Sequence, residues 1–314
     1  MKKTIIVISI SAAALFAGCE RTLDIDVPEH QPRLVLGMLQ ETGTPLRAQV
    51  SRSKGILAPR NPGNPNNGYQ VSNALVLVYE NNVVTDTLKY NATELSYTTR
   101  TNKVFLPGVQ YRVTAAASGF NTVESTVKAP LPVPINSISR VRNARSNSLG
   151  EVLDDILVNF TDPGSEKNYY MVSIQTPYFS GGAAVSYYQV NCIYSNDVDI
   201  DRLDASGDPF GSDNCLTDEV LLNDNNFNGR AKQLRLSVPG FYIDEVVNTT
   251  NGRVYRPFIE LMHITESQYR YLKSRQVYNN AADNPFAEPA LVYTNITNGY
   301  GVLGIQTTVR DSIR

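Results

Sequence analysis

Short strand-like runs rich in apolar residues fill the first part of the chain after residue 32. They are RLVLGML (33–39), LRAQVS (46–51), ALVLVYE (74–80), VVTDTLKY (83–90), YRVTAAA (111–117) and NTVESTVKA (121–129). Clusters of Gly, Pro, Asn and Thr separate the runs, and such close spacing is typical of an antiparallel β-sandwich. We therefore predict an Ig-like or transthyretin-like β-sandwich over residues 33–128.

A second group of alternating runs follows a proline-rich segment. Residues 129–137 read APLPVPINS, in which Pro alternates with apolar residues and favours an extended, semi-rigid backbone. We place a domain boundary at this hinge. Apolar residues then alternate in YYMVSIQ (169–175) and in KQLRLSV (232–238), as expected of half-buried strands. Residues 138–314 are therefore predicted to form a second antiparallel β-sandwich domain.

One helix is predicted near the end of this second domain. The run PFIELMHI (257–264) indicates a strand, and residues 265–279 have helical spacing of Tyr269, Leu272 and Gln276. Thr265 and Gln268 have the spacing of a capping box, in which the Gln side chain bonds back to the N-terminal residue. The predicted fold class is mostly β, with a single helix before the last strand.

The N-terminus has the pattern of a signal peptide over residues 1–18. Lys2 and Lys3 precede an apolar run from residue 4 to residue 16, which is too short for a transmembrane helix of about twenty residues. Cys19 follows Ala17-Gly18 and resembles the lipobox cysteine of bacterial lipoproteins, although Phe16 stands where Leu is typical. The resemblance implies acylation of Cys19 with diacylglyceryl and palmitate-like chains; the alternative is ordinary secretory cleavage before an unrelated cysteine. Residues 19–32 are then a polar tether.

Charge and motifs exclude several function classes. The net charge is −2 and there is no run of Lys or Arg, so nucleic acid is not an expected partner. The sequence lacks the G-x-S-x-G, H-E-x-x-H, Walker and dinucleotide-binding patterns, and its only two histidines are His30 and His263. We predict that the protein is not an enzyme. A hydrolase with paired carboxylates remains an alternative, because such pairs follow no sequence spacing.

Aromatic residues are available for binding. The chain has 18 Tyr and no Trp, which favours a protein partner over a dedicated glycan-stacking surface. Adjacent pairs such as Tyr169-Tyr170 and Tyr187-Tyr188 are expected to place one ring in the core and one on the opposite face of a strand.

Two further cysteines lie in the predicted second domain. An oxidising compartment favours pairing, and acylation of Cys19 leaves an even number, so we predict a disulfide between Cys192 and Cys215. Closing this loop would stabilise the fold by roughly 3 kcal/mol in the chain-entropy model.

The loop between these cysteines is strongly acidic. Asp197, Asp199 and Asp201 occupy positions one, three and five of an EF-hand-like loop, and Asp208 occupies position twelve. Arg202 stands at position six, where the turn needs Gly, and no Glu closes the loop. Two interpretations remain open, a weak calcium site and a solvated acidic loop tied down by the disulfide; we favour the second. No other cofactor is expected.

The C-terminal segment 284–309, NPFAEPALVYTNITNGYGVLGIQTTV, resembles the terminal signature of a Bacteroidota lipoprotein family of unknown function. The matching residues are Pro285, Phe286, Glu288, Pro289, Asn295, Ile296, Gly299, Gly301 and Val302. Leu303 departs from the aromatic residue usual in the family. Because Gly and Pro usually serve backbone geometry, these residues are expected to be conformational and not ligand contacts.

Lipoproteins of this kind are typically encoded beside TonB-dependent outer-membrane receptors. The resemblance therefore implies a lipid-anchored outer-membrane protein, on the cell surface, that associates with a TonB-dependent transporter and aids cargo capture or retention. Two alternatives remain, a free-standing surface protein that binds a glycan, peptide or protein, and the carboxylate-dependent hydrolase.

Overall fold

The computed structural model describes residues 30–55, 69–147, 149–179, 185–201, 220–248, 252–282 and 290–314. Within these residues the fold is mostly β, with the α-helix α2 (Glu266–Ala282) before the last strand, β17 (Tyr300–Ser312). The predicted fold class is therefore confirmed. Of the predicted tether, only residues 30–32 are described.

Most predicted strands form close to their expected positions. In chain order the strands are β1 (Leu34–Glu41), β2 (Arg47–Arg52), β3 (Leu75–Glu80), β4 (Val83–Asn91), β5 (Ser96–Thr98), β6 (Gln110–Ala116), β7 (Val123–Lys128), β8 (Ile135–Ser146), β9 (Val152–Thr161), β10 (Tyr169–Phe179), β11 (Val185–Gln189), β12 (Val220–Asn223), β13 (Ala231–Pro239), β14 (Val246–Val247), β15 (Val254–Tyr255), β16 (Phe258–Ile264) and β17. A short 3₁₀ turn, η1 (Gly240–Ile243), follows β13.

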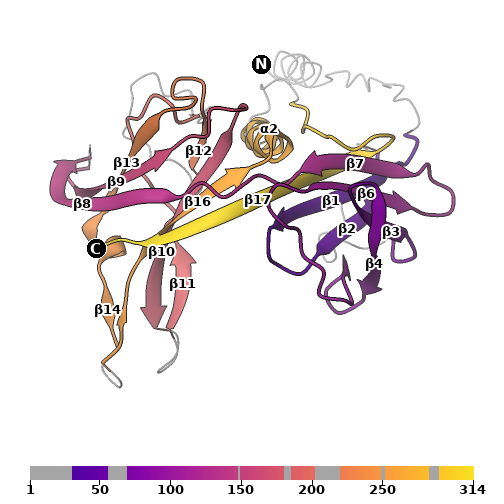
Figure 1. Ribbon diagram of the computed structural model, residues 1–314, viewed down its shortest axis with the longest axis horizontal. Helices are drawn as coiled ribbons and strands as arrows, with labels where there is room; N and C mark the ends of the chain where they lie inside the picture. The colour runs from indigo at the N-terminus through magenta and orange to yellow at the C-terminus, as the bar shows by residue number, and fades with distance from the viewer. Residues whose placement is uncertain are drawn as a thin grey trace, which may run out of the picture.

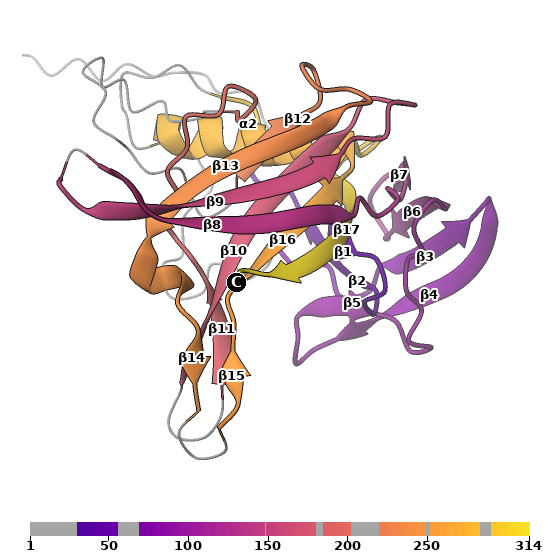
Figure 2. The ribbon, with the colours of Figure 1, turned by 60° about the vertical axis from the view of Figure 1, so that its left-hand side comes forward.

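One large sheet extends through both halves of the described chain (Figures 1 and 2). Its strand order is β11-β10-β16-β17-β1-β2-β5-β4-β3-β6-β7, and β12 pairs with β10. Strand β17 joins the halves, because it pairs in parallel with β1 and antiparallel with β16. A second sheet, β13-β9-β8, covers one face of the C-terminal half. The parallel pair and the shared sheet were not part of the prediction of two antiparallel sandwiches.

The interior has two main hydrophobic cores, and β17 contributes to both. Leu303 and Ile305 pack with β1, β3 and β6 in the N-terminal core, whereas Ile313, just after β17, packs with β9, β10 and β13 in the C-terminal core. The predicted boundary at residues 129–137 is not tested by this arrangement, although β8 begins within it, at Ile135.

Strand β10 is buried on both faces. Tyr170 belongs to the C-terminal core, and Tyr169 packs on the opposite face against Tyr269 and Leu272 of α2. The rings of Tyr169 and Tyr269 lie 4.6 Å apart. Aromatic contacts therefore hold α2 against this face of the sheet (Figure 2).

Only half of the predicted capping box forms at the start of α2. The Thr265 hydroxyl accepts the Gln268 N–H at 3.4 Å. The Gln268 side chain donates instead to Gln306 Oε1 at 2.7 Å. The Thr265 N–H, which the box would have satisfied, donates to the Ile305 carbonyl at 3.0 Å. Strand β17 therefore replaces the return bond of the box.

Two signature glycines allow β17 to approach its neighbours closely. Gly301 has φ of +109°, and a Cβ there would lie 2.1 Å from the Leu36 carbonyl oxygen. A Cβ at Gly299 would lie 2.4 Å from the Leu34 carbonyl oxygen. Both positions exclude a side chain, because atoms cannot approach backbone oxygen so closely.

Replacing Gly301 by Ala is expected to lower the free energy of unfolding by about 3 kcal/mol or more, through steric conflict and an unfavourable φ. Gly37→Ala is the matched control, since Gly37 is in the paired strand β1 and has no atom within 4 Å of its virtual Cβ. That control should change stability by about 1 kcal/mol or less. Urea unfolding followed by tyrosine fluorescence measures both; equal effects would contradict the close approach.

Candidate functional site

A groove of about 730 Å³ opens where the ends of β7 and β16 meet the start of α2. Figure 1 shows β7 directed toward α2, with the chain that precedes β17 passing beside both. The lining residues come from five parts of the chain, namely 126–130, 166–169, 263–267, 293 and 295. Its size lies within the range of ligand-binding pockets, so we take it as the candidate site.

One wall of the groove is formed by β7, the edge strand of the large sheet. Strand β7 pairs with β6, and its Glu124 carbonyl accepts the Thr297 N–H at 2.8 Å on the other side. The two segments separate beyond this isolated bridge. Tyr293 donates its N–H to Ser274 Oγ at 2.7 Å, and the Asn295 side chain turns to Leu303. The groove lies in the space that this separation opens.

His263, on β16, lies in the wall of the groove. Its side chain is buried, and its Nδ1 lies 2.8 Å from the Leu131 carbonyl oxygen. A carbonyl only accepts, so Nδ1 carries the proton of the neutral ring. The ring stacks on Tyr170 at a centroid distance of 5.2 Å. Burial lowers the pKa of His263 and outweighs the opposing effect of the Leu131 hydrogen bond.

This histidine is held as a structural group. In the described part of the chain its ring bonds to the Leu131 carbonyl, and no hydroxyl or thiol is hydrogen-bonded to it. Nucleophilic catalysis needs a nucleophile within hydrogen-bond reach of its base. The described contacts of His263 are those of a packed side chain.

Charges of both signs surround the groove. Lys128 and Lys167 contribute positive charge, and Glu166 and Glu266 contribute negative charge. Glu266 lies 3.7 Å from Arg270, one turn later in α2, and the Lys167 ammonium lies 5.6 Å from the Tyr169 ring. Such a mixed lining suits a polar, peptide-like ligand better than a single strongly charged one.

The described signature residues make backbone contacts. The Asn295 amide donates to the Leu303 carbonyl at 2.9 Å, and its Oδ1 accepts the Leu303 N–H at 2.9 Å. Ile296 is buried in the N-terminal core, and Gly299 and Gly301 admit the close approach of β1. These contacts agree with a conformational role. Pro285, Phe286, Glu288 and Pro289 lie outside the described residues.

The predicted calcium ligands do not converge where they are described. Asp197 and Asp199 both bind the Lys232 ammonium, at 2.7 Å for Asp197. Asp201 instead accepts hydrogen bonds from the Tyr269 hydroxyl and from Lys273, at 2.9 Å for Lys273.

Among the described residues, no group of three or more His, Cys, Asp or Glu is placed to hold a metal. Asp208 lies outside the described residues, so the weak calcium site stays a prediction. Cys19 and Cys215 lie outside them as well. Cys192 is in the described segment after β11, and its pairing with Cys215 stays a prediction.

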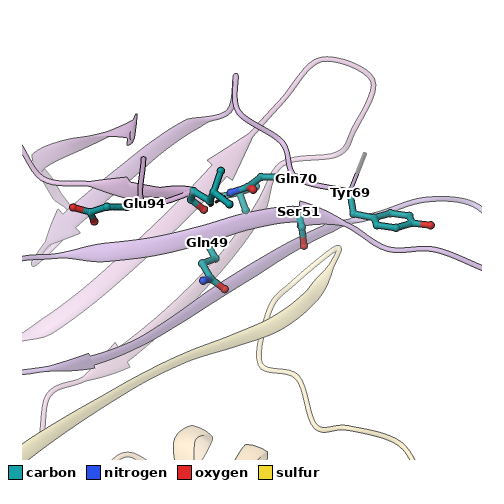
Figure 3. A pocket seen from close by; sticks show the side chains of 7 residues that line it. Gln49, Ser51, Tyr69, Gln70 and Glu94 are labelled. Carbon is teal, nitrogen blue, oxygen red and sulfur yellow. Dashed lines mark hydrogen bonds between the residues drawn. The ribbon is translucent and has the colours of Figure 1, made fainter. Parts of the chain in front are cut away.

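A second, smaller cavity of about 290 Å³ lies in the N-terminal half. Figure 3 shows its polar side chains, which include Gln49, Tyr69 and Glu94, pointing in different directions. Gln70 is engaged with the Leu95 carbonyl, and Glu94 with Arg47. Because the polar groups do not converge, this cavity is the weaker candidate.

Sequence reasoning identified only part of the groove. It noted His263 and Asn295, but not Thr126, Lys128 or Tyr293. The outer edge of β7 is free because the segment before Thr297 separates from β7 after a single bridge. No local pattern in residues 121–129 indicates that separation. Predicting the groove would have required knowledge of the contact between residues 124 and 297, which are far apart in the sequence.

Residues 20–312 match the model of a protein family described as a domain of unknown function, DUF4249. No curated protein and no solved structure matches the chain. The family match covers both halves of the fold, including the groove.

Replacing His263 by Asn should reduce the acid sensitivity of the fold. Asn keeps an N–H donor for the Leu131 carbonyl but removes the titrating ring. In the wild type, the unfolded chain binds a proton near pH 6.5 while the buried ring, with its lowered pKa, does not. The free energy of unfolding therefore falls as the pH drops below about 6.5, by up to about 1.4 kcal/mol per pH unit.

The measurement is the difference in unfolding free energy between pH 7.5 and pH 5.5, obtained from urea titrations. The wild type should lose more stability than His263→Asn over this interval. Identical losses would show that the ring is not held neutral by burial.

Proposed function

We propose that the chain, which belongs to the DUF4249 family, is a lipid-anchored outer-membrane accessory protein that associates with a TonB-dependent transporter. In this role it helps the transporter to capture or retain cargo at the cell surface. The groove beside β7 is the observation that carries the proposal, because it offers a preformed binding surface, and no described nucleophile is bonded to His263.

The N-terminal sequence supports the anchor. A diacylglyceryl group together with an N-acyl chain on Cys19 would meet the two-signal requirement for stable membrane attachment. No α-helix in the described part of the chain is long and apolar enough to cross a membrane. Eleven residue steps separate Cys19 from His30, a reach of at most roughly 40 Å. The tether would hold the folded part close to the membrane.

The described chain begins beside β2. His30 Nε2 lies 2.9 Å from Ser53 Oγ, which attaches the first described residue to the chain just after β2. Figure 1 shows α2 on the upper side of the molecule and the tips of β11 and β14 on the lower side.

The choice of a TonB-dependent transporter comes from the resemblance of the C-terminal signature to lipoproteins encoded beside such receptors. The lack of Trp and the mixed charge of the groove favour a protein partner over a sugar.

A second candidate is a free-standing surface binding protein. Its supporting observation is the hairpin β10–β11, on which Tyr178, Tyr187 and Tyr188 are each 41% exposed. The prediction of one core ring in the Tyr187-Tyr188 pair is therefore wrong. Tyr178 and Tyr188 are in edge contact at 5.4 Å, and Tyr187 packs on Phe258 at 5.0 Å. Rigid exposed tyrosines are typical of binding surfaces. This candidate predicts affinity for a glycan or peptide in the absence of a barrel.

Detergent extraction of a C-terminally tagged chain, followed by affinity purification and mass spectrometry, tests the leading proposal. A TonB-dependent β-barrel should be recovered with the wild type and depleted with Cys19→Ser. The Cys19→Ser variant should also move from the membrane pellet to the soluble fraction. Recovery of no barrel from native membranes would count against the transporter, and unchanged fractionation of the variant would count against the anchor.

A further inference from the structure

The outer edge of β7 carries backbone groups that have no partner among the described residues. Ala129, directly after β7, donates its N–H to the Val109 carbonyl and so faces β6. Backbone direction alternates along a strand, so Val127 also faces β6, whereas Thr126 and Lys128 face away from it. The Glu124 carbonyl confirms this phase, because it accepts from Thr297 on the outer side.

The chain itself begins to add a strand to this edge and then leaves it. Thr297 forms an antiparallel bridge with Glu124. Continued pairing would place Asn295 opposite Thr126 and Tyr293 opposite Lys128. Both are held elsewhere, by Leu303 and by Ser274. Within the described residues, the outward N–H and C=O groups of Thr126 and Lys128 have no hydrogen-bond partner.

These groups border the groove, so they are open to a ligand. Thr126 and Lys128 are exposed and line the 730 Å³ space. Another edge strand, β8, is interrupted where its pairing with β9 shifts between Val141 and Arg145, and Asn143 has φ of +49° there. Such bulges prevent strand addition. The pairing of β7 with β6 continues without a register shift.

We infer that the β7 edge binds an extended segment of a partner protein as an added strand, continuing the antiparallel bridge that Thr297 makes with Glu124. Main-chain hydrogen bonds to Thr126 and Lys128 would provide binding, and the side chains opposite them would provide selectivity. Cross-strand preferences favour a β-branched residue opposite Thr126 and Asp or Glu opposite Lys128. The Lys128 ammonium takes part in none of the ion pairs of the described residues, which makes it available for this pair.

This inference deepens the proposed function by naming the kind of contact that the accessory protein makes. It does not require the partner to be a barrel, and the two can fail separately.

The test uses the full chain in detergent and a random library of linear eight-residue peptides displayed on phage. A fluorescein-labelled copy of a selected peptide then serves as the probe, and fluorescence anisotropy gives its dissociation constant. Thr126→Pro removes the outward N–H and is tolerated at a strand edge, so it should weaken binding about tenfold. Thr126→Val retains the N–H and should bind within about twofold of the wild type.

A second variant keeps the test decisive if Thr126→Pro disturbs folding. Lys128→Glu should weaken binding of a probe with Asp or Glu opposite residue 128, and replacing that acid by Lys in the probe should restore it. Amide hydrogen exchange at residues 126 and 128 should slow when the wild type binds the probe. Failure to select any peptide, equal binding by Thr126→Pro and Thr126→Val when both are folded, or no protection of these amides would overturn the inference.

Affinity purification with the same variants separates this inference from the proposed function. Equal recovery of a barrel by the wild type and Thr126→Pro would support the association with a transporter and contradict strand addition at β7. Peptide binding that depends on Thr126, with no barrel recovered, would support strand addition at β7 and contradict the association with a transporter.

Discussion

The parallel pairing of β17 with β1 is the contact on which the rest of the structure depends. It aligns Val35 with Tyr300 and continues to Glu41 opposite Gln306. The pair forms only because Gly301 brings its backbone against the Leu36 carbonyl, at a distance that no side chain would allow. Through this pair, a strand at the C-terminus completes a core built mainly from the first third of the chain. The same strand then pairs with β16 and brings Ile313 to the second core.

The groove is a consequence of that arrangement. Its two main walls are each bonded to β17. The helix start is attached through Thr265 to Ile305 and through Ser267 to Leu303. The segment after β7 is attached on the other side, where Thr307 donates to the Pro130 carbonyl at 2.7 Å. Because both walls are fixed to one strand, the space between them is set before any ligand binds, which limits the entropy lost on binding.

Local pattern was sufficient to predict most of the secondary structure. Short apolar runs located β1 and β3, alternation located β10, and helical spacing located α2, because each of these signals depends on neighbouring residues. The three-residue strand β5 was missed, since it is too short to show alternation. Parallel pairing of β1 with β17 was not predictable, because the partners are separated by almost the whole chain and their pairing leaves no local signal.

The same limit applies to the candidate site. Asp197 and Asp199 have the spacing of calcium ligands, but the pattern could not show that Lys232 on β13 lies between them. Likewise, the half of the capping box that failed did so because Ile305, far along the chain, accepts the Thr265 N–H. Charge and hydrogen-bonding capacity can be counted from sequence, whereas the choice of partner depends on the tertiary fold.

The groups proposed for binding are separate from the groups that hold the fold together. The outward N–H and C=O of Thr126 and Lys128 are not used in pairing with β6, and both side chains are exposed. Val123 and Ser125, two positions apart on the same strand, are buried and face the interior. Along β7, residues 123 and 125 therefore place their side chains in the core and their backbone groups toward β6. Residues 126 and 128 place their side chains in solvent and their backbone groups at the free edge. Substitutions at residues 126 and 128 can alter partner selectivity with little effect on stability, whereas Gly301 has no such freedom because the core of both halves depends on it.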